Sequence, residues 1–195
     1  MKKDNKPTTV WPFEVDTLEH WAYRDNAFTK KECKEIIKIG KQTSFIEGRT
    51  RSGVTKHRLS KINWMYPSHE TQWIFRRLTD YLVDLNKQFF KFDLFGFIEG
   101  LQFTCYKAPD NFYTKHTDLF MNGPVRKLSM SLQLTDPNEY KGGDLRLHLA
   151  DEPTILAKDQ GKLYVFPSYT LHEVTPVTKG TRYSLVAWIT GPHFK

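Results

Sequence analysis

The first part of the chain carries its apolar residues at helical spacing. Thr29 and Glu32 form a capping-box pattern, because the threonine hydroxyl can accept a hydrogen bond from the third amide of a helix and the glutamate can reach back. Cys33 and Ile36 follow on one face, and Gly40 marks the end. This spacing predicts a short amphipathic helix.

A second helical pattern starts near Pro67-Ser68 and continues to about Phe90. Its apolar residues recur every three or four positions: Trp73, Ile74, Leu78, Tyr81, Leu82, Leu85 and Phe89. Such a stripe is what a helix needs to pack against a sheet, so we interpret it as core and not as a ligand site.

From Phe97 onward the pattern changes to a period of two, which is typical of strands. Strands are predicted at residues 97–106, 127–135, 144–150, 162–166, 171–177 and 182–190, after a shorter one at 59–65. Lys179-Gly180 predicts a hairpin between the last two. Helices followed by seven or more short strands favour an α+β chain that is mainly β, with N-terminal helices on an antiparallel sandwich or barrel.

The length and uniform composition predict one domain covering residues 1–195. Residues 1–10 look flexible, residues 29–90 form a helical support, and residues 97–191 form the β core. Two distant cysteines, a polar N-terminus and the lack of a long apolar run favour a cytoplasmic protein that does not enter a membrane.

The net charge of +7 would attract an anionic partner. The charge is spread along the chain and is densest between Arg49 and Arg58. This segment is interpreted either as a solvated basic loop or as a loop that helps to hold a substrate such as an acidic peptide or a nucleic acid.

The candidate chemistry begins with His116-x-Asp118, whose side chains leave an extended segment from the same face. Together with His172 they provide two imidazoles and one carboxylate, which suit a ferrous ion that keeps open positions. Arg182 shares a strand face with Ser184, and as a buried arginine among apolar neighbours it would need an anion such as a dicarboxylate.

Taken together, these motifs resemble the iron(II)- and 2-oxoglutarate-dependent dioxygenases, and among them the prolyl-4-hydroxylase-like branch. The resemblance runs from about Phe28 to Gly191 and rests on residues 102–106, 113–118, 142–145, 161–167 and 172–184. It implies a double-stranded β-helix, or jelly roll, which agrees with the strand count.

The resemblance also implies roles for particular residues. His116, Asp118 and His172 would hold iron, and Arg182 would bind the distal carboxylate of 2-oxoglutarate. Three residues are candidates for further contacts to the co-substrate: Tyr106, Ser184 and Gln133, the last standing where some relatives have a tyrosine. Four residues are candidates for the substrate side: Tyr113, Trp188, Arg49 and Arg58.

The implied reaction is hydroxylation of an unactivated C–H bond, with O2 and 2-oxoglutarate consumed, succinate and CO2 released, and ascorbate as a candidate reductant. A peptidyl proline in a protein or peptide is the expected substrate. A free amino acid and a nucleic acid are alternatives, but demethylases of nucleic acids usually carry a second arginine where this chain has Trp188. A jelly-roll binding module without catalysis is the remaining alternative.

Overall fold

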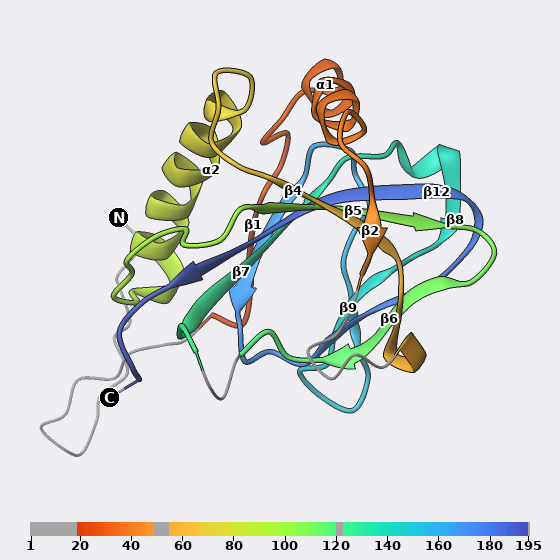
Figure 1. Cartoon of the computed structure of the whole chain (residues 1–195). Helices are drawn as coiled ribbons and strands as arrows, with labels where there is room; N and C mark the ends of the chain where they lie inside the picture. The colour runs from red at the N-terminus through yellow and green to blue at the C-terminus, as the bar shows by residue number, and fades with distance from the viewer. Residues whose placement is uncertain (1–18, 49–54, 120–122, 195) are drawn as a thin grey trace, which may run out of the picture.

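The computed structural model describes residues 19–48, 55–119 and 123–194, and in these the chain forms two facing antiparallel sheets (Figure 1). The larger sheet has the order β1 (Ala22–Arg24), β11 (Leu163–Pro167), β7 (Arg126–Gln133), β12 (His172–Thr190), β5 (Leu101–Lys107), β4 (Lys61–Met65) and β2 (Ile46–Glu47). The smaller sheet contains β3 (Arg58–Leu59), β6 (Asn111–His116), β8 (Tyr140–Gly142), β9 (Leu145–Leu147) and β10 (Thr154–Ile155). The prediction of a mainly β chain with a jelly-roll core is therefore confirmed.

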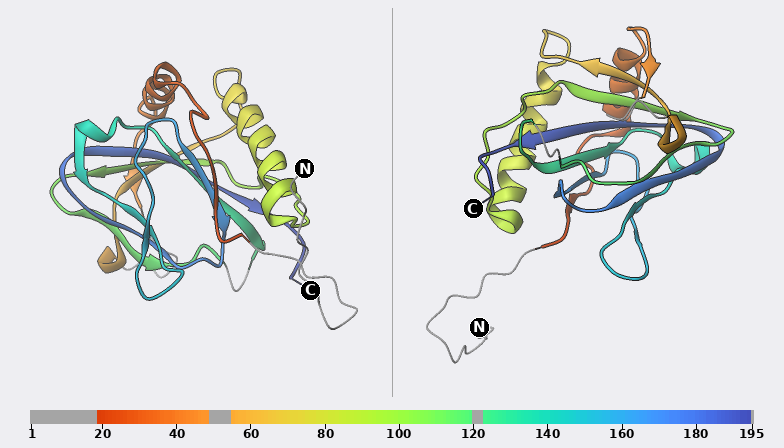
Figure 2. Two further views of the ribbon diagram at one scale, coloured as in Figure 1. Left: turned by 180° about the vertical axis from the view of Figure 1, so that it is seen from behind. Right: turned by 60° about the horizontal axis from the view of Figure 1, so that its bottom comes forward.

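Strand β12 belongs to both sheets (Figure 2). Its first part pairs with β6, β8 and β9, and its second part pairs with β5 and β7. The predicted hairpin at Lys179-Gly180 is wrong, because the chain turns back there but its two arms lie in different sheets and do not pair with each other. Of the two residues only Gly180, the second, has a positive φ (73°), whereas the favoured two-residue hairpin turns need a positive φ at the first residue.

Helix α1 (Lys30–Gly40) begins as the sequence predicts. The Thr29 side chain accepts a hydrogen bond from the Glu32 amide (3.2 Å), and the Glu32 carboxylate accepts one from the Thr29 amide (2.8 Å). At the other end, Gly40 allows the helix to lie close to β5, since a Cβ there would stand 2.5 Å from the Phe103 ring. The capping-box prediction is confirmed.

Helix α2 (Gln72–Leu85) starts later than predicted and continues as a π-helical turn, Asn86–Phe90. The Thr71 hydroxyl donates to the Tyr66 carbonyl and accepts from the Ser68 amide, and these local bonds hold residues 66–71 in a turn outside the helix. Short 3₁₀ turns occupy Thr55–His57 and Pro137–Glu139. Neither α-helix of the described residues has the length and apolar character needed to cross a bilayer.

Both helices lie against one face of the larger sheet (Figures 1 and 2). The apolar face of the sheet and the buried stripe of α2 form the core: Leu101, Phe103, Leu128, Leu132, Leu185, Ile189, Ile74, Leu78, Leu82 and Leu85. The other face of the sheet carries polar residues that are also buried, among them Gln102, Thr104, Ser129, Ser131 and Ser184. All eight residues of β7 are buried, so its polar face looks into the space between the sheets.

Two predicted strands are shorter than the pattern suggests. The strand expected at residues 97–106 begins at Leu101, and the one expected at 144–150 is limited to Leu145–Leu147. The range predicted as helical support, residues 29–90, also contains β2, β3 and β4, of which β3 and β4 pair with strands of the β core.

Candidate active site

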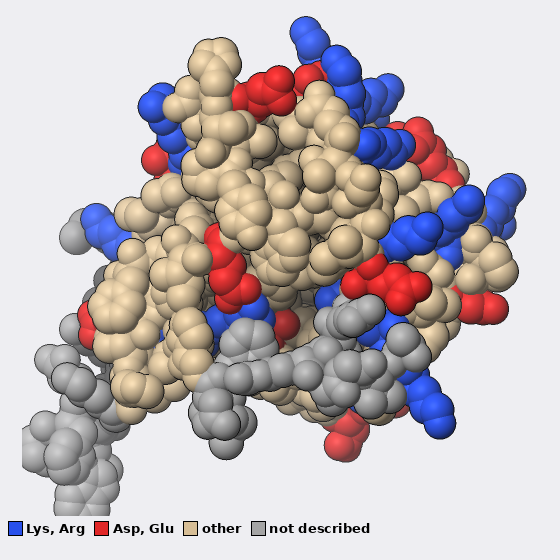
Figure 3. All heavy atoms as spheres, in the orientation of Figure 1, with Lys and Arg blue, Asp and Glu red and all other residues tan. Residues whose placement is uncertain are grey.

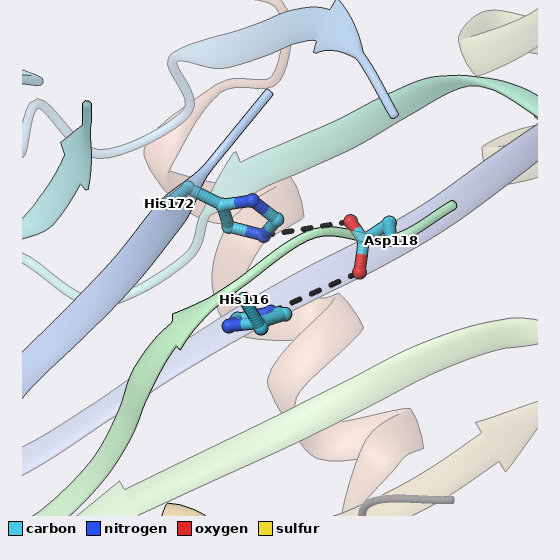
Figure 4. Close-up of side chains that lie close together, drawn as sticks. All are labelled: His116, Asp118 and His172. Atoms are coloured by element: carbon cyan, nitrogen blue, oxygen red, sulfur yellow. Dashed lines mark ion pairs between the residues drawn. The ribbon is translucent and has the colours of Figure 1, made fainter. Parts of the chain in front are cut away.

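The side chains of His116, Asp118 and His172 meet at the inner face of the smaller sheet (Figure 4). His116 ends β6 and lies opposite His172, the first residue of β12. Asp118 follows two residues later, where its amide donates to the Ser168 carbonyl (2.9 Å). One ligand atom from each residue lies within 4.8 Å of the others, which is close enough for a single metal ion.

Backbone carbonyls fix the orientation of both imidazoles. Nδ1 of His116 lies 2.7 Å from the Thr114 carbonyl oxygen, and Nδ1 of His172 lies 2.9 Å from that of Thr170. A carbonyl oxygen only accepts, so Nδ1 carries the proton in each ring and Nε2 keeps its lone pair. Both Nε2 atoms face Asp118, at 3.8 Å and 3.5 Å from its oxygens, as expected for oriented metal ligands.

The surroundings set the charge of these groups. Burial and the neighbouring His172 lower the pKa of His116 to about 4, although Asp118 opposes the shift, so the ring is neutral near pH 7. Burial raises the pKa of Asp118, but the two imidazoles lower it by more. The pKa of Asp118 is therefore below its usual value, and the group is a carboxylate. The indole N–H of Trp188 and the Ser129 hydroxyl lower the pKa of Asp118 as well.

The Asp118 carboxylate is held by a serine on the larger sheet. The Ser129 hydroxyl donates to Oδ2 of Asp118 (2.7 Å), and it lies 3.0 Å from the Ser168 hydroxyl. The two sheets are therefore tied together at the carboxylate, which restricts its rotation.

Arg182 lies deep in the same pocket and is only 1% exposed. Its guanidinium donates to Gln133 Oε1 (2.9 Å) and to Ser184 Oγ (3.3 Å), while its buried Nε has no partner among the described residues. The Tyr106 ring lies 5.5 Å from the guanidinium carbon. A buried cation held only by neutral oxygens is suited to receive an anion.

The pocket brings together most of the residues that the sequence singled out: Arg58, Tyr106, Tyr113, His116, Asp118, His172, Arg182, Ser184 and Trp188. The Tyr113 ring stacks on the His116 ring with 3.4 Å between centroids. Gln133 contacts Arg182 as described, and Arg49 lies outside the described residues.

Several pocket residues were not among the predicted ones, notably Gln102, Thr104, Ser129 and Ser131. They occupy the polar positions of alternating strands, which usually face solvent. The signal for them was the alternation itself, combined with the prediction that Arg182 and Ser184 face the interior of the same barrel.

Charges of both signs lie on the face shown in Figure 3. Among the described residues, acidic and basic side chains lie side by side in its lower centre, and other basic side chains lie along its upper and right-hand margins.

Comparisons with known proteins agree with this geometry. The sequence model of the 2OG-Fe(II) oxygenase superfamily matches residues 101–190, which include all three candidate metal ligands and Arg182. Over these 90 of its 195 residues the chain is similar to the 2OG-Fe(II) oxygenase superfamily.

Curated relatives of this chain are called PKHD-type hydroxylases. One from Prochlorococcus marinus is 38% identical over 93 residues, which are 47% of this chain and 42% of that protein. One from a Synechococcus species is 26% identical over 165 residues, 81% of this chain and 72% of that protein. The chain thus spans less than half the length of the first relative and about three quarters of the second.

Solved structures show the same fold. A prolyl-4-hydroxylase from Pseudomonas putida superposes with a TM-score of 0.71 at 22% identity, covering 89% of this chain and 94% of the other. A prolyl hydroxylase from Trichoplax adhaerens, in complex with a hypoxia inducible factor peptide, gives 0.74 at 17% identity, covering 88% and 84%.

The residues present fit the iron and 2-oxoglutarate that the family name implies. Two imidazoles, whose Nδ1 atoms face backbone carbonyls, and one carboxylate would supply three ligand atoms to one ion, the donor set of a ferrous ion that keeps open positions. The guanidinium of Arg182, buried and without a carboxylate partner in the part of the chain that the structure describes, fits the remaining acid group of the co-substrate. The prediction of Fe(II) and 2-oxoglutarate thus agrees with the matching family model and with the residues in the pocket. The role of each residue stays a prediction.

Proposed function

We propose that this oxygenase hydroxylates an unactivated C–H bond of a peptidyl proline, using Fe(II), O2 and 2-oxoglutarate. The observation that carries the oxygenase chemistry is the placement of His116, Asp118 and His172 in one pocket with the buried cation of Arg182. The choice of proline is supported by two proteins that share the fold, one called a prolyl-4-hydroxylase and the other a prolyl hydroxylase.

In this proposal the metal ligands would be His116, Asp118 and His172. Bound iron supplies the oxidation of the C–H bond, coupled to conversion of 2-oxoglutarate to succinate and CO2. The chain contributes orientation: the Thr114 and Thr170 carbonyls fix the imidazoles, and Ser129 fixes the carboxylate.

Arg182 would hold the co-substrate by its distal carboxylate, with Gln133 and Ser184 keeping the guanidinium in place. The aromatic rings of Tyr113 and Trp188 would form walls for the substrate and exclude water from the reacting carbon. Trp188 is itself fixed by Arg126, whose guanidinium carbon lies 3.8 Å from the ring centroid and whose nitrogens pair with Glu99.

The test is mass spectrometry of a library of proline-containing peptides incubated with the protein, Fe(II), 2-oxoglutarate and ascorbate. We expect the mass gain of one oxygen atom on proline, absent with His172→Ala. Succinate formation without any oxidised proline would contradict the prolyl substrate. Failure to form succinate under any of these conditions would contradict the oxygenase activity as well.

Nucleic acid is the less favoured substrate. The position six residues after Arg182 holds the aromatic Trp188 and not a second cation, and it lines the pocket. A single domain over residues 1–195, a cytoplasmic location and the need for ascorbate stay predictions.

A further inference from the structure

A second buried arginine, Arg58, lines the pocket from the smaller sheet. It lies on β3 opposite Tyr113 of β6, and it is only 6% exposed. Its guanidinium carbon stands 4.7 Å from the Tyr113 ring centroid, and that ring in turn stacks on His116. The interpretation of this end of the basic segment as a solvated loop is therefore wrong for Arg58.

The hydrogen-bond partners of Arg58 are neutral. Its Nε donates to the Ser60 hydroxyl (2.8 Å), and its Nη2 donates to Gln102 Oε1 (2.8 Å). Within the described parts of the chain, no carboxylate lies at ion-pair distance from this guanidinium. An arginine has five N–H donors, so the two bonds leave Nη1 and one N–H of Nη2 for another acceptor.

The environment of Arg58 repeats that of Arg182. Each guanidinium is buried, and each donates to one glutamine Oε1 and one serine Oγ. A buried charge held only by neutral oxygens is costly unless an anion completes the site. The distal carboxylate of the co-substrate would be the anion for Arg182. The co-substrate does not supply an anion for Arg58.

The two arginines mark different parts of the pocket. The Arg182 guanidinium donates to Ser184, which pairs with Thr104 of β5, whereas Arg58 is bound to Gln102, two residues earlier on the same strand. At about 3.3 Å per residue this separates the two levels by roughly 7 Å. In the proposed function the other end of the co-substrate belongs to the metal, which leaves Arg58 for the substrate.

The position of Arg58 is fixed by its neighbours. The Gly48 amide donates to the Ser60 carbonyl (2.8 Å), and a Cβ at Gly48 would stand 2.7 Å from Nε of Arg58 and 2.4 Å from the Ser60 hydroxyl. The glycine backbone thus packs directly on the arginine and its serine partner. A guanidinium held in this way keeps three N–H groups free, and one from each of Nη1 and Nη2 form a rigid fork that matches the two oxygens of a carboxylate.

We propose that Arg58 binds a carboxylate of the substrate and selects peptides in which an acid group lies next to the oxidised residue. This inference rests on the proposed function and specifies that its peptide substrate carries a negative charge next to the oxidised residue. The carboxylate comes either from an aspartate or glutamate beside the proline or from the C-terminus of a peptide that ends in proline.

The experiment compares peptides that differ only in one charge. One pair is Gly-Pro-Glu and Gly-Pro-Gln, both with amidated C-termini, and the other is acetyl-Gly-Pro with a free or an amidated C-terminus. Binding is measured by calorimetric titration of the protein loaded with Mn(II) and 2-oxoglutarate, so that no turnover is needed. KM and kcat for proline oxidation are then measured with Fe(II).

For the wild-type protein we expect the acid of at least one pair to bind on the order of 10- to 100-fold more tightly than its amide, as for a lost charge-assisted hydrogen bond. Arg58→Gln should reduce this ratio to about one, chiefly through the affinity for the acid. Arg58→Lys should keep part of the preference, because it retains the charge without the fork. Arg77→Gln, on α2 and outside the pocket, is the matched control and should keep the full ratio.

Unchanged binding of 2-oxoglutarate by Arg58→Gln shows that the pocket is intact, and Arg58→Lys serves if the glutamine variant does not fold. Equal binding of acid and amide by the wild-type protein, a preference that survives in Arg58→Gln, or no binding by any of the four peptides overturns this proposal. Oxidation of proline with no preference for the acid would overturn it while supporting the proposed function. Tighter binding of the acid peptide without oxidation of proline would support carboxylate binding by Arg58 and contradict the proposed prolyl reaction.

Discussion

The substitution Arg182→Lys tests the co-substrate site with a defined magnitude. The change keeps the charge but replaces a two-pronged fork by a single ammonium, so one charge-assisted hydrogen bond to the distal carboxylate is lost. Such a bond contributes about 2 kcal/mol, which weakens 2-oxoglutarate binding roughly 30-fold. The burial of Arg182, 1% exposed, argues against solvent replacing the lost bond.

The assay is thermal unfolding with Mn(II), with and without 2-oxoglutarate. At a ligand concentration of about 100 times the wild-type Kd, binding stabilises the protein by about 2.7 kcal/mol, whereas a 30-fold weaker variant gains about 0.9 kcal/mol. For a chain of 195 residues, 1 kcal/mol corresponds to about 2–4 °C in Tm. The ligand should therefore raise Tm by about 5–10 °C in the wild-type protein and by about 2–4 °C in the variant.

Two controls make the outcome specific. Arg77→Lys makes the same change on α2, where the side chain pairs with Glu32, and it should keep the full ligand-induced shift. 2-Oxobutyrate, which lacks the distal carboxylate, should stabilise the wild-type protein and Arg182→Lys equally. If 2-oxoglutarate raised the Tm of Arg182→Lys as much as that of the wild-type protein, the assignment of Arg182 to the distal carboxylate would be refuted.

Two further variants test the metal site and the fold. Ser129→Ala removes the hydroxyl that holds Asp118, and it should weaken metal binding on the order of 10-fold in a chelator competition, whereas Ser131→Ala on the same strand face should not. Gly180→Ala should lower the free energy of unfolding in urea by more than about 2 kcal/mol, because it combines a left-handed backbone with a Cβ placed 2.1 Å from the Glu139 carbonyl oxygen. Gly96→Ala, which has a positive φ but open space, separates backbone strain from the clash and should cost less.

The parts of the fold that depend on local chemistry could be predicted from the sequence. Thr29 and Glu32 are sufficient to begin α1, since a capping box needs only neighbouring residues. The start of α2 could not be predicted from periodicity, because the Thr71 side chain binds the Tyr66 carbonyl in place of a helical partner. The pairing on either side of Gly180 could not be predicted either. The glycine indicates a change of direction, but the strands that pair with the two parts of β12 lie far away in the chain.

The site shows a similar division. The sequence indicated His116, Asp118 and His172 as a group, and the structure places them within reach of one ion. The alternation within β7 does not by itself reveal that its polar face looks inward, because an alternating strand reads the same whether its polar side meets water or a polar pocket. Ser129 was missed for this reason.

The two-sheet course of β12 has a consequence for how the protein acquires its iron. His172 and Arg182 lie on the two arms of this one strand, and His172 pairs with His116, more than fifty residues earlier in the chain. Contacts this distant form only after long loops close, which makes them slow steps of folding. Binding of a metal ion at the proposed site should therefore be among the last events of folding. An incompletely folded chain would then not hold iron before the part of β12 that carries Arg182 is in place.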